Sequence, residues 1–254
     1  MNSSAQIKIG ALLSYVAIGV NILAGLIYTP WMVNQIGQSQ YGLFTLANSL
    51  ITLFLVDFGL SSATARFVSN YHAENRQDKV DSFLGAIYKL YLLIDSIIFV
   101  ALIVIYFLID KIYVKLTPTE LQQFKIVFII AASYSLINFP FITLNGILTA
   151  YEKFIQLKLA DLLYRLFTVG LMVLALLNNM GLYALVSVNA IVGIAIIIYK
   201  LIIIKKTTPV KVDFKKTERA TYKDIFGFSM WTTITSLAQR LIFNITPTIL
   251  GMVS

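Results

Sequence analysis

The sequence places ionisable side chains within long apolar stretches, where they could hold or pass a charge. Asp57 lies in the run LITLFLVDFGLSSATA (50–65), and Arg66 follows it nine residues later. Ionisable residues inside membrane-spanning segments are rare, and they usually face a bundle interior or a wet cavity. Others in the same setting are Lys89, Asp95, Asp161, Arg165 and Arg240. Such residues indicate contacts with an anion, ion pairs between helices, or coupling to a cation.

Several of these residues also have a purely structural explanation. Lys89 and Asp161 lie in the half of their segments nearer the expected cytoplasmic side, so their side chains could extend to the lipid head groups. Asp57 and Arg165 lie at similar depth and could form a structural ion pair. Asparagines within the spans could serve as hydrogen bonds between helices. Arg240 is the deepest of the cations, and it is therefore the hardest to explain by structure alone.

The spacing of Asp57 and Arg66 predicts that they do not pair with each other. On one continuous helix, nine residues turn the chain by about 900°. The two side chains would then point to opposite faces of the helix, and Asp57 would need a partner on another element.

The sequence lacks the residue sets of common enzyme sites. His72 is the only histidine and there is no cysteine. A nucleophilic triad at Ser61 or Ser62 would therefore lack its base, and a metal site beside Glu74 would lack its ligands. No glycine-rich phosphate loop of the G-x-x-x-x-G-K-S type occurs. The sequence predicts no enzymatic activity and no resident cofactor, and it leaves transport, channel or scaffold roles.

Membrane-spanning helices are the elements that we expect to position these residues. Of the 254 residues, 58% are hydrophobic and only 13% are charged, whereas soluble domains have about 25% charged residues. Each apolar segment has about 20 residues or more, enough for a helix to cross a ~30 Å hydrocarbon core. None alternates as a transmembrane barrel strand would. The fold class is therefore all-α and integral to the membrane, with seven segments at 9–33, 41–65, 82–109, 122–149, 157–177, 181–204 and 225–250.

Basic residues predict the orientation of these segments. With a cytoplasmic N-terminus, the inner loops and helix ends contain fourteen Lys and Arg residues, eight of them in 200–224, and the outer ones contain only Lys111, Lys115 and Lys125. Because cytoplasmic loops are rich in Lys and Arg, we expect the N-terminus in the cytoplasm. This bias explains the net charge of +8, and no nucleic-acid partner is expected. Anionic membrane lipids are the expected contacts of 200–224.

Two motifs give the chain a family resemblance. The stretch FPFITLNGILTAYEKF (139–154) is similar to the fourth helix, and the turn after it, of bacterial polysaccharide flippases. These flippases belong to the multidrug/oligosaccharidyl-lipid/polysaccharide exporter superfamily. The stretch IGQSQYGLFTLANSLITLFLVDFGLSSATARFVS (36–69) resembles their first hairpin, and the matching residues are Ile36-Gly37, Tyr41-Gly42, Asp57, Gly59-Leu60 and Arg66. The resemblance covers essentially the whole chain.

The resemblance implies a flippase of the bacterial plasma membrane. Such a protein moves an undecaprenyl-diphosphate-linked oligosaccharide from the cytoplasmic to the outer leaflet for surface polysaccharide biosynthesis, including that of lipopolysaccharide. Arg66, Arg165, Arg240 and Asn145 are the expected substrate contacts, because a guanidinium group donates paired hydrogen bonds to a diphosphate. Polysaccharide polymerase and glycosyltransferases are the expected protein partners.

Coupling and gating are assigned to two carboxylates under the same resemblance. Asp57 and Asp95 are the expected residues, with a proton or sodium ion as the coupling ion. Asp57 is expected to pair with Arg165 or another cation in one of two conformations. The pair would then form or break during alternating access.

Two other functions stay open from the sequence. A cation-coupled multidrug exporter would share the superfamily fold, although arginines inside the spans favour an anionic substrate. A membrane polysaccharide polymerase or ligase would usually carry a large extracytoplasmic loop, whereas the longest outer loop here is the short stretch at 110–121.

An internal repeat predicts the domain organisation. Gly10 precedes Thr29-Pro30 as Gly227 precedes Thr246-Pro247, and in both cases the proline lies twenty positions after the glycine. Transporters are commonly built from two such repeats with the substrate site between them. We therefore expect a truncated two-lobe transporter, with an N-terminal lobe of six helices at 1–204, a basic cytoplasmic linker at 205–223, and the first helix of a second lobe at 224–254.

Overall fold

The chain is almost entirely helical over the residues that the structure, a computed structural model, describes. These are residues 3–54, 57–215, 221–230, 232–235, 238–239 and 249, and they contain no strand. The elements are α1 (Ser3–Leu23), η1 (Ala24–Tyr28), α2 (Thr29–Ile36), α3 (Gln38–Phe54), α4 (Leu60–Ala73), α5 (Gln77–Ile112), α6 (Pro118–Asn138), η2 (Phe139–Ile142), α7 (Thr143–Ala150), α8 (Phe154–Leu177) and α9 (Gly181–Thr207). A further helical stretch follows at 221–230.

Within the described residues, five helical segments are long and apolar enough to cross a membrane. They are Gln6–Ile36, Gln77–Ile112, Pro118–Ala150, Phe154–Leu177 and Gly181–Thr207. These segments confirm five of the predicted spans and the all-α membrane class, so the chain is a multi-span membrane protein. Half of the predicted segment 225–250 lies outside the described residues.

The prediction of one continuous helix over 41–65 is wrong, because the helix is broken around Asp57. α3 ends at Phe54 and α4 begins at Leu60. Between them, Phe58 and Gly59 have φ angles of 52° and 69°, which a right-handed helix cannot include. Glycine adopts this conformation readily, but phenylalanine does so only under strain. Asp57 and Arg66 therefore do not share a helix, and the rotation argument for their opposite faces does not hold.

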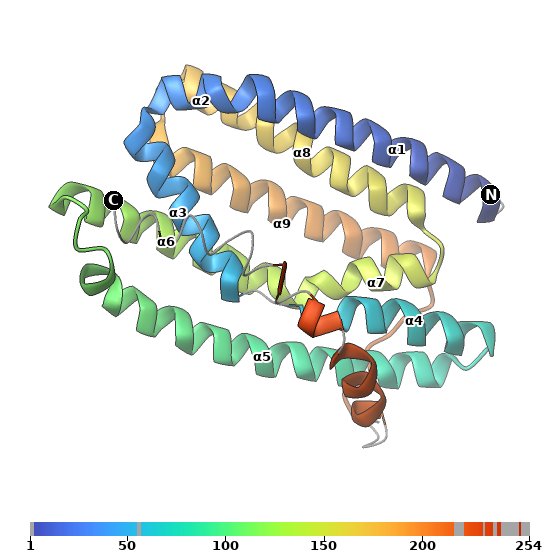
Figure 1. The fold of residues 1–254 in the computed structure, drawn as a ribbon. Coiled ribbons are helices and arrows are strands. Elements are labelled where there is room, and N and C mark those ends of the chain that lie inside the picture. The colour runs from blue at the N-terminus through green and yellow to red at the C-terminus, as the bar shows by residue number, and fades with distance from the viewer. Residues whose placement is uncertain are drawn as a thin grey trace.

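The helices pack as a stack of layers (Figure 1). α1 lies along α8, α8 along α9, and α9 contacts α6, while α4 packs on α7. α5 lies at the edge of the stack opposite α1. The N-terminus and the C-terminal ends of α4, α7 and α9 lie together at one end of the lobe. We call it the basic end, because the chain there carries Arg76, Lys79, Lys153, Lys205, Lys206 and Lys211.

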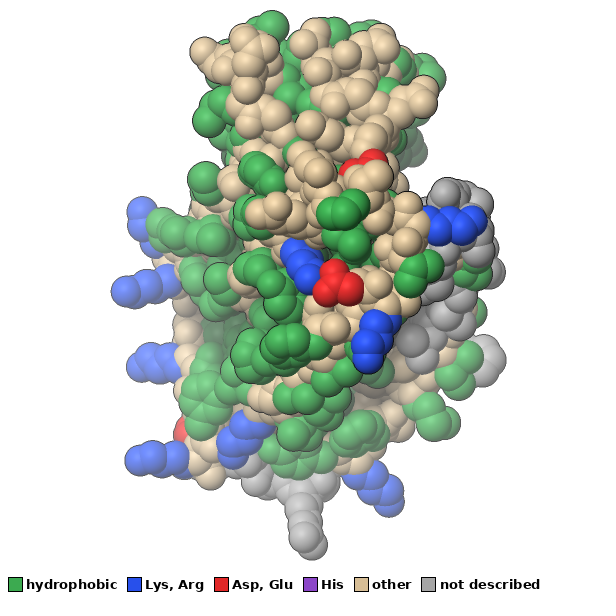
Figure 2. Space-filling view, turned by 90° about the vertical axis from the view of Figure 1, so that its left-hand side faces the viewer, with side chains coloured by type: hydrophobic (Ala, Val, Ile, Leu, Met, Phe, Trp, Pro, Cys, Tyr) green, Lys and Arg blue, Asp and Glu red, His purple; other side chains and the backbone are tan. Residues whose placement is uncertain are grey.

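The other end of the lobe has a different surface. It is formed by the corner between α2 and α3 and by the turns that follow α5 and α8. Figure 2 looks onto this end, where most of the visible surface is hydrophobic or uncharged, most Lys and Arg side chains project singly near the edges, and basic and acidic side chains lie together near the centre. Ser39 donates a 2.5 Å hydrogen bond there to Glu120, which also forms a capping box with Thr117 at the start of α6. This contact ties the start of α3 to the start of α6.

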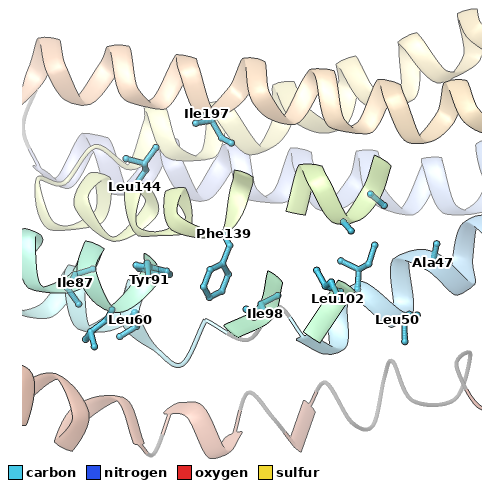
Figure 3. Close-up of a cluster of buried hydrophobic side chains, with 14 of the residues drawn as sticks. Ala47, Leu50, Leu60, Ile87, Tyr91, Ile98, Leu102, Phe139, Leu144 and Ile197 are labelled. Atoms are coloured by element: carbon cyan, nitrogen blue, oxygen red, sulfur yellow. The ribbon is translucent and has the colours of Figure 1, made fainter. Parts of the chain in front are cut away.

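The core lies where α5 passes beneath α4, α6 and η2 (Figure 3). Phe139 points from η2 toward α5, and its ring lies 5.2 Å from that of the buried Tyr91. α4 and α7 approach so closely that a Cβ atom on Gly146 would lie 2.4 Å from the carbonyl oxygen of Ser61. The hydroxyls of Thr64 and Thr143 meet at 3.1 Å in the same interface. Small residues thus allow backbone contact between helices, as is common in membranes.

After α9, the chain returns along the start of α5 as a segment that we call the strap (208–215). The backbone N–H groups of Lys211 and Asp213 donate to the carboxylate and the carbonyl of Asp81, at 2.9 and 3.1 Å. A Cβ atom on Gly85 would lie only 2.0 Å from the Asp213 carbonyl oxygen. The described part of this basic segment is therefore fixed to α5.

Candidate functional site

Asp57 is held by groups from the break itself and from α5. The backbone N–H of Ser61 donates to one of its carboxylate oxygens at 3.2 Å, and the N–H of Leu60 donates to its carbonyl at 3.0 Å. The hydroxyl of the buried Tyr91 donates to the other carboxylate oxygen. A carboxylate at a helix N-terminus satisfies free N–H groups and is stabilised by the helix dipole. Asp57 thus joins the start of α4 to α5.

Arg165 lies on α8, where it interacts electrostatically with Tyr28 and Tyr164. Its Nε atom is buried and has no hydrogen-bond partner in the described part of the chain. Among the ion pairs of the described residues, none joins Arg165 to Asp57. Their pairing therefore stays a prediction for another conformation.

A polar chamber lies among α6, α7, α8 and α9. Its volume is about 310 Å³. The ammonium of Lys200 donates a 2.9 Å hydrogen bond to the Asn145 side-chain oxygen and lies 3.6 Å from the Asp161 carboxylate. Tyr164 also lies in the chamber wall, and its hydroxyl donates a hydrogen bond to the side-chain oxygen of Asn189. The polar side chains that line the chamber are Tyr134, Asn138, Asn145, Asp161, Tyr164 and Lys200.

Lys200 lies inside the helix bundle, although the sequence predicts it in the basic stretch 200–224. α9 continues to Thr207, and only 12% of the Lys200 side chain is exposed. Asp161, for which extension to the head groups was one explanation, pairs with it. The apolar run Leu-Ile-Ile-Ile at 201–204 is the signal that could have placed Lys200 inside a span. The chamber thus contains an ion pair within the bundle.

A second cavity, the basic pocket, lies between α4 and the helical stretch that begins at 221. Its volume is about 760 Å³. The Arg66 guanidinium lies 4.9 Å from the ring centre of Phe228 and 5.8 Å from that of Phe67. A guanidinium that stacks on a ring keeps its N–H edge available for an anion. The residues that line the pocket are Arg66, Phe67, Lys223, Asp224, Gly227, Phe228 and Thr232.

Those predicted site residues that the structure describes lie at several separate places. Arg66 lines the basic pocket, Asn145 lines the polar chamber, and Asp57 lies at the helix break. Asp95 lies on α5 and has one buried carboxylate oxygen without a hydrogen-bond partner in the described part of the chain. Arg240 lies outside the described residues. Lys223, which the sequence analysis counted only as a loop charge, adds a second cation to the basic pocket.

Solved transporter structures resemble this fold. A MOP superfamily transporter from Pyrococcus furiosus, for which a binding pocket of reversed polarity has been described, has a TM-score of 0.72 and 14% identity over 99% of this chain and 63% of that chain. A MATE protein in complex with MaD3S has a TM-score of 0.74 and 14% identity over 99% of this chain and 64% of that one. An inward-facing multidrug resistance MATE transporter has a TM-score of 0.70 and 13% identity over 95% and 55%. These likenesses show the fold alone, and this chain spans less than two thirds of those chains.

Sequence comparison gives the family. A search of curated protein sequences found no match to this chain. The model of a family described as polysaccharide biosynthesis protein matches residues 8–254. The chain therefore belongs to the polysaccharide biosynthesis protein family, and its described helices have the fold of MOP superfamily transporters.

Proposed function

We propose that the chain acts in a flippase that moves an oligosaccharide linked to undecaprenyl diphosphate from the cytoplasmic to the outer leaflet. The proposal places it in the bacterial plasma membrane with the N-terminus in the cytoplasm. In this role the flippase supplies lipid-linked oligosaccharides for the synthesis of surface polysaccharide, including lipopolysaccharide. Neither family membership nor fold specifies the substrate, so the argument rests on the chemistry of the basic pocket.

The basic pocket carries the proposal. Arg66 and Lys223 place a guanidinium and an ammonium around one cavity of about 760 Å³. A diphosphate needs charged donors of this kind, and arginine binds such groups through two parallel hydrogen bonds. Asp224 also lines the pocket, and its carboxylate would repel a phosphate but accept hydrogen bonds from sugar hydroxyls.

The place of the basic pocket agrees with loading from the cytoplasmic leaflet. Arg66 lies in α4, which runs from the break near Asp57 to the basic end of the lobe. Because basic ends of membrane proteins face the cytoplasm, the pocket would meet carriers made at that surface. The ion pair of the polar chamber lies on other helices, and we do not include it in the substrate path.

Alternating access is the mechanism that we propose for translocation. The chain resembles an inward-facing and an outward-facing MATE transporter about equally, with TM-scores of 0.70 and 0.71. This similarity favours a lobe that keeps its internal packing while it moves as a body. Asp57, at the break, is the proposed switch, with a proton or sodium ion as the coupling ion.

The test is export of polysaccharide in a strain from which the gene for this chain has been deleted. We expect lipid-linked oligosaccharide to accumulate on the cytoplasmic leaflet of the deletion strain. A full-length copy of the gene should restore export. Arg66→Ala should restore it poorly, because the diphosphate loses its paired donor. Arg76→Ala is the matched control, since Arg76 is exposed and pairs with Glu74 at 3.4 Å. Normal export by Arg66→Ala at normal abundance would refute the role of the basic pocket.

A cation-coupled multidrug exporter is the second candidate, and the MATE likenesses favour it. It predicts that deletion increases sensitivity to cationic drugs and leaves surface polysaccharide unchanged. The same deletion strain therefore decides between the two functions.

A further inference from the structure

An apolar groove of about 400 Å³ lies between α5 and the helical stretch that begins at 221. Its wall is open to the surroundings, because 60% of Leu93 and 68% of Met230 are exposed. Ser229 and Thr233 also line the groove, and none of the described residues that line it is charged. The large apolar side chains that line it are Phe58, Leu60, Leu90, Leu93, Ile94, Ile225, Phe226, Met230 and Ile234.

The groove and the basic pocket lie on two faces of one helix. Within the described stretch 221–230, positions 225, 226, 229 and 230 line the groove, and positions 223, 224, 227 and 228 line the basic pocket. Residues three or four positions apart share a face of a helix. A molecule bound to Arg66 therefore lies within one helix width of the groove.

The two cavities also differ in depth. On α4, which runs toward the basic end, Leu60 lines the groove and comes before Arg66 and Phe67, which line the basic pocket. On α5, which starts at the basic end with Gln77 and ends at Ile112, Leu90 and Leu93 lie near the middle. The groove thus lies closer to the middle of the membrane than the basic pocket does.

We propose that this groove holds the first part of the isoprenoid tail of the carrier whose diphosphate occupies the basic pocket. The inference rests on the proposed function and specifies how the substrate is bound. A polyprenyl diphosphate has a doubly charged head and a single long apolar chain that leaves it directly. A charged pocket near the membrane surface and an uncharged groove deeper in the membrane fit these two parts.

This arrangement predicts that the tail stays outside the path of the sugars. The groove lies between α5 and one face of the 221 helix, while Phe228 on the other face of that helix and Arg66 on α4 line the basic pocket. The head group would then cross while the tail remains in contact with lipid. A protein with separate sites for the head and the tail would recognise the carrier by its tail as well as by its diphosphate.

The test compares two ligands with the same head group, using native-length protein in lipid nanodiscs. Undecaprenyl diphosphate has the full tail, and inorganic diphosphate has none. Leu93→Trp fills the groove, while Leu92→Trp is the matched control, since Leu92 is the neighbouring residue, is 52% exposed and does not line the groove. We expect Leu93→Trp to weaken undecaprenyl diphosphate binding about tenfold, because a tail already in lipid gains only van der Waals contacts in a groove. Binding of inorganic diphosphate, which has no tail to place in the groove, should not change.

Each further outcome has a distinct meaning. If both tryptophan variants bind undecaprenyl diphosphate as the wild type does, the groove proposal is wrong and the proposed function stands. If neither diphosphate binds the wild type, the proposed function fails and the groove proposal fails with it. A diazirine on the first isoprene unit provides a second readout. Crosslinks to peptides that contain Leu93 or Met230 would support the proposal. Crosslinks found only elsewhere would overturn it, and so would a phospholipid that cannot be displaced from the groove.

Discussion

Lys200 on α9 donates a 2.9 Å hydrogen bond to the side-chain oxygen of Asn145 on α7. Its ammonium also lies 3.6 Å from the carboxylate of Asp161 on α8. Three helices of the lobe are therefore held together by one mostly buried charge. Because removing one member of such a pair leaves the other with poorer solvation, the pair should behave as a unit.

We predict that Asp161→Asn and Lys200→Met have non-additive effects on the melting temperature of the purified protein. The double variant should be more stable than the sum of the single effects predicts, with a coupling of about 1 kcal/mol. The value is small because Asp161 is 47% exposed, so the pair is only partly buried. Additive shifts in a double-mutant cycle would mean that Lys200 and Asp161 do not depend on each other.

The role of the Asp57 charge can be separated from its hydrogen bonds to Ser61 and Tyr91. Asparagine can still accept from the Ser61 N–H and can donate its amide to the Tyr91 hydroxyl, whereas alanine loses both hydrogen bonds, each worth about 1 kcal/mol. We therefore predict that Asp57→Asn keeps near wild-type stability but exports glycan at a strongly reduced rate, while Asp57→Ala loses both. Export is measured relative to the abundance of the protein in the membrane. Wild-type export by Asp57→Asn, or by Asp57→Ala at normal abundance, would eliminate Asp57 as the switch.

Gly146 tests the close packing of α4 against α7. A Cβ atom there would lie 2.4 Å from the Ser61 carbonyl oxygen and 2.8 Å from the Thr64 Cβ atom, so Gly146→Ala must separate two backbones. We expect a loss of roughly 1–3 kcal/mol of stability, as for other overpacked interiors. Gly170→Ala on α8 is the control, because a Cβ there meets nothing within 4 Å, and alanine favours a helix by up to about 1 kcal/mol. Equal melting temperatures for the two variants would contradict this packing.

Gly85 tests the attachment of the strap to α5. A Cβ atom at this position would lie 2.0 Å from the Asp213 carbonyl oxygen, so Gly85→Ala should displace the strap. Lys211 and Lys215 are trypsin sites in the strap, and we predict faster cleavage after them in Gly85→Ala. Gly19→Ala is the control, since a Cβ there meets nothing within 4 Å. Unchanged cleavage of Gly85→Ala would show that the strap is not fixed by this contact.

The sequence predicted the spans well because apolar length is a property of each segment alone. Residues 82–109, for example, lie within α5. It did not predict the break at 57–59, since Asp57 and Gly59 are also compatible with a continuous helix that carries a polar residue. Phe58, whose conformation is left-handed, packs against the main buried core, and such tertiary contacts are not encoded in a local pattern.

The candidate site was predicted less completely, for a related reason. Arg66 was found because arginine in an apolar stretch is unusual, but its stacking on Phe228 joins residues far apart in the chain. Lys200 was assigned to a loop because a lysine near other lysines is usually solvated. Its partners Asn145 and Asp161 come from two other helices, so only the tertiary structure reveals that it is buried.

Because the strap is bonded to α5, a mechanical force on the chain would not pass through the helices in their order along the sequence. α9 precedes the strap in sequence, yet the strap is bonded to Asp81 on α5. A pull transmitted through the backbone from the 221 helix would reach α5 at Asp213 before it reached the end of α9. The tension would then be taken up by a helix more than a hundred residues earlier in the chain, and α9, with the Lys200 ion pair of the polar chamber, would be shielded from it.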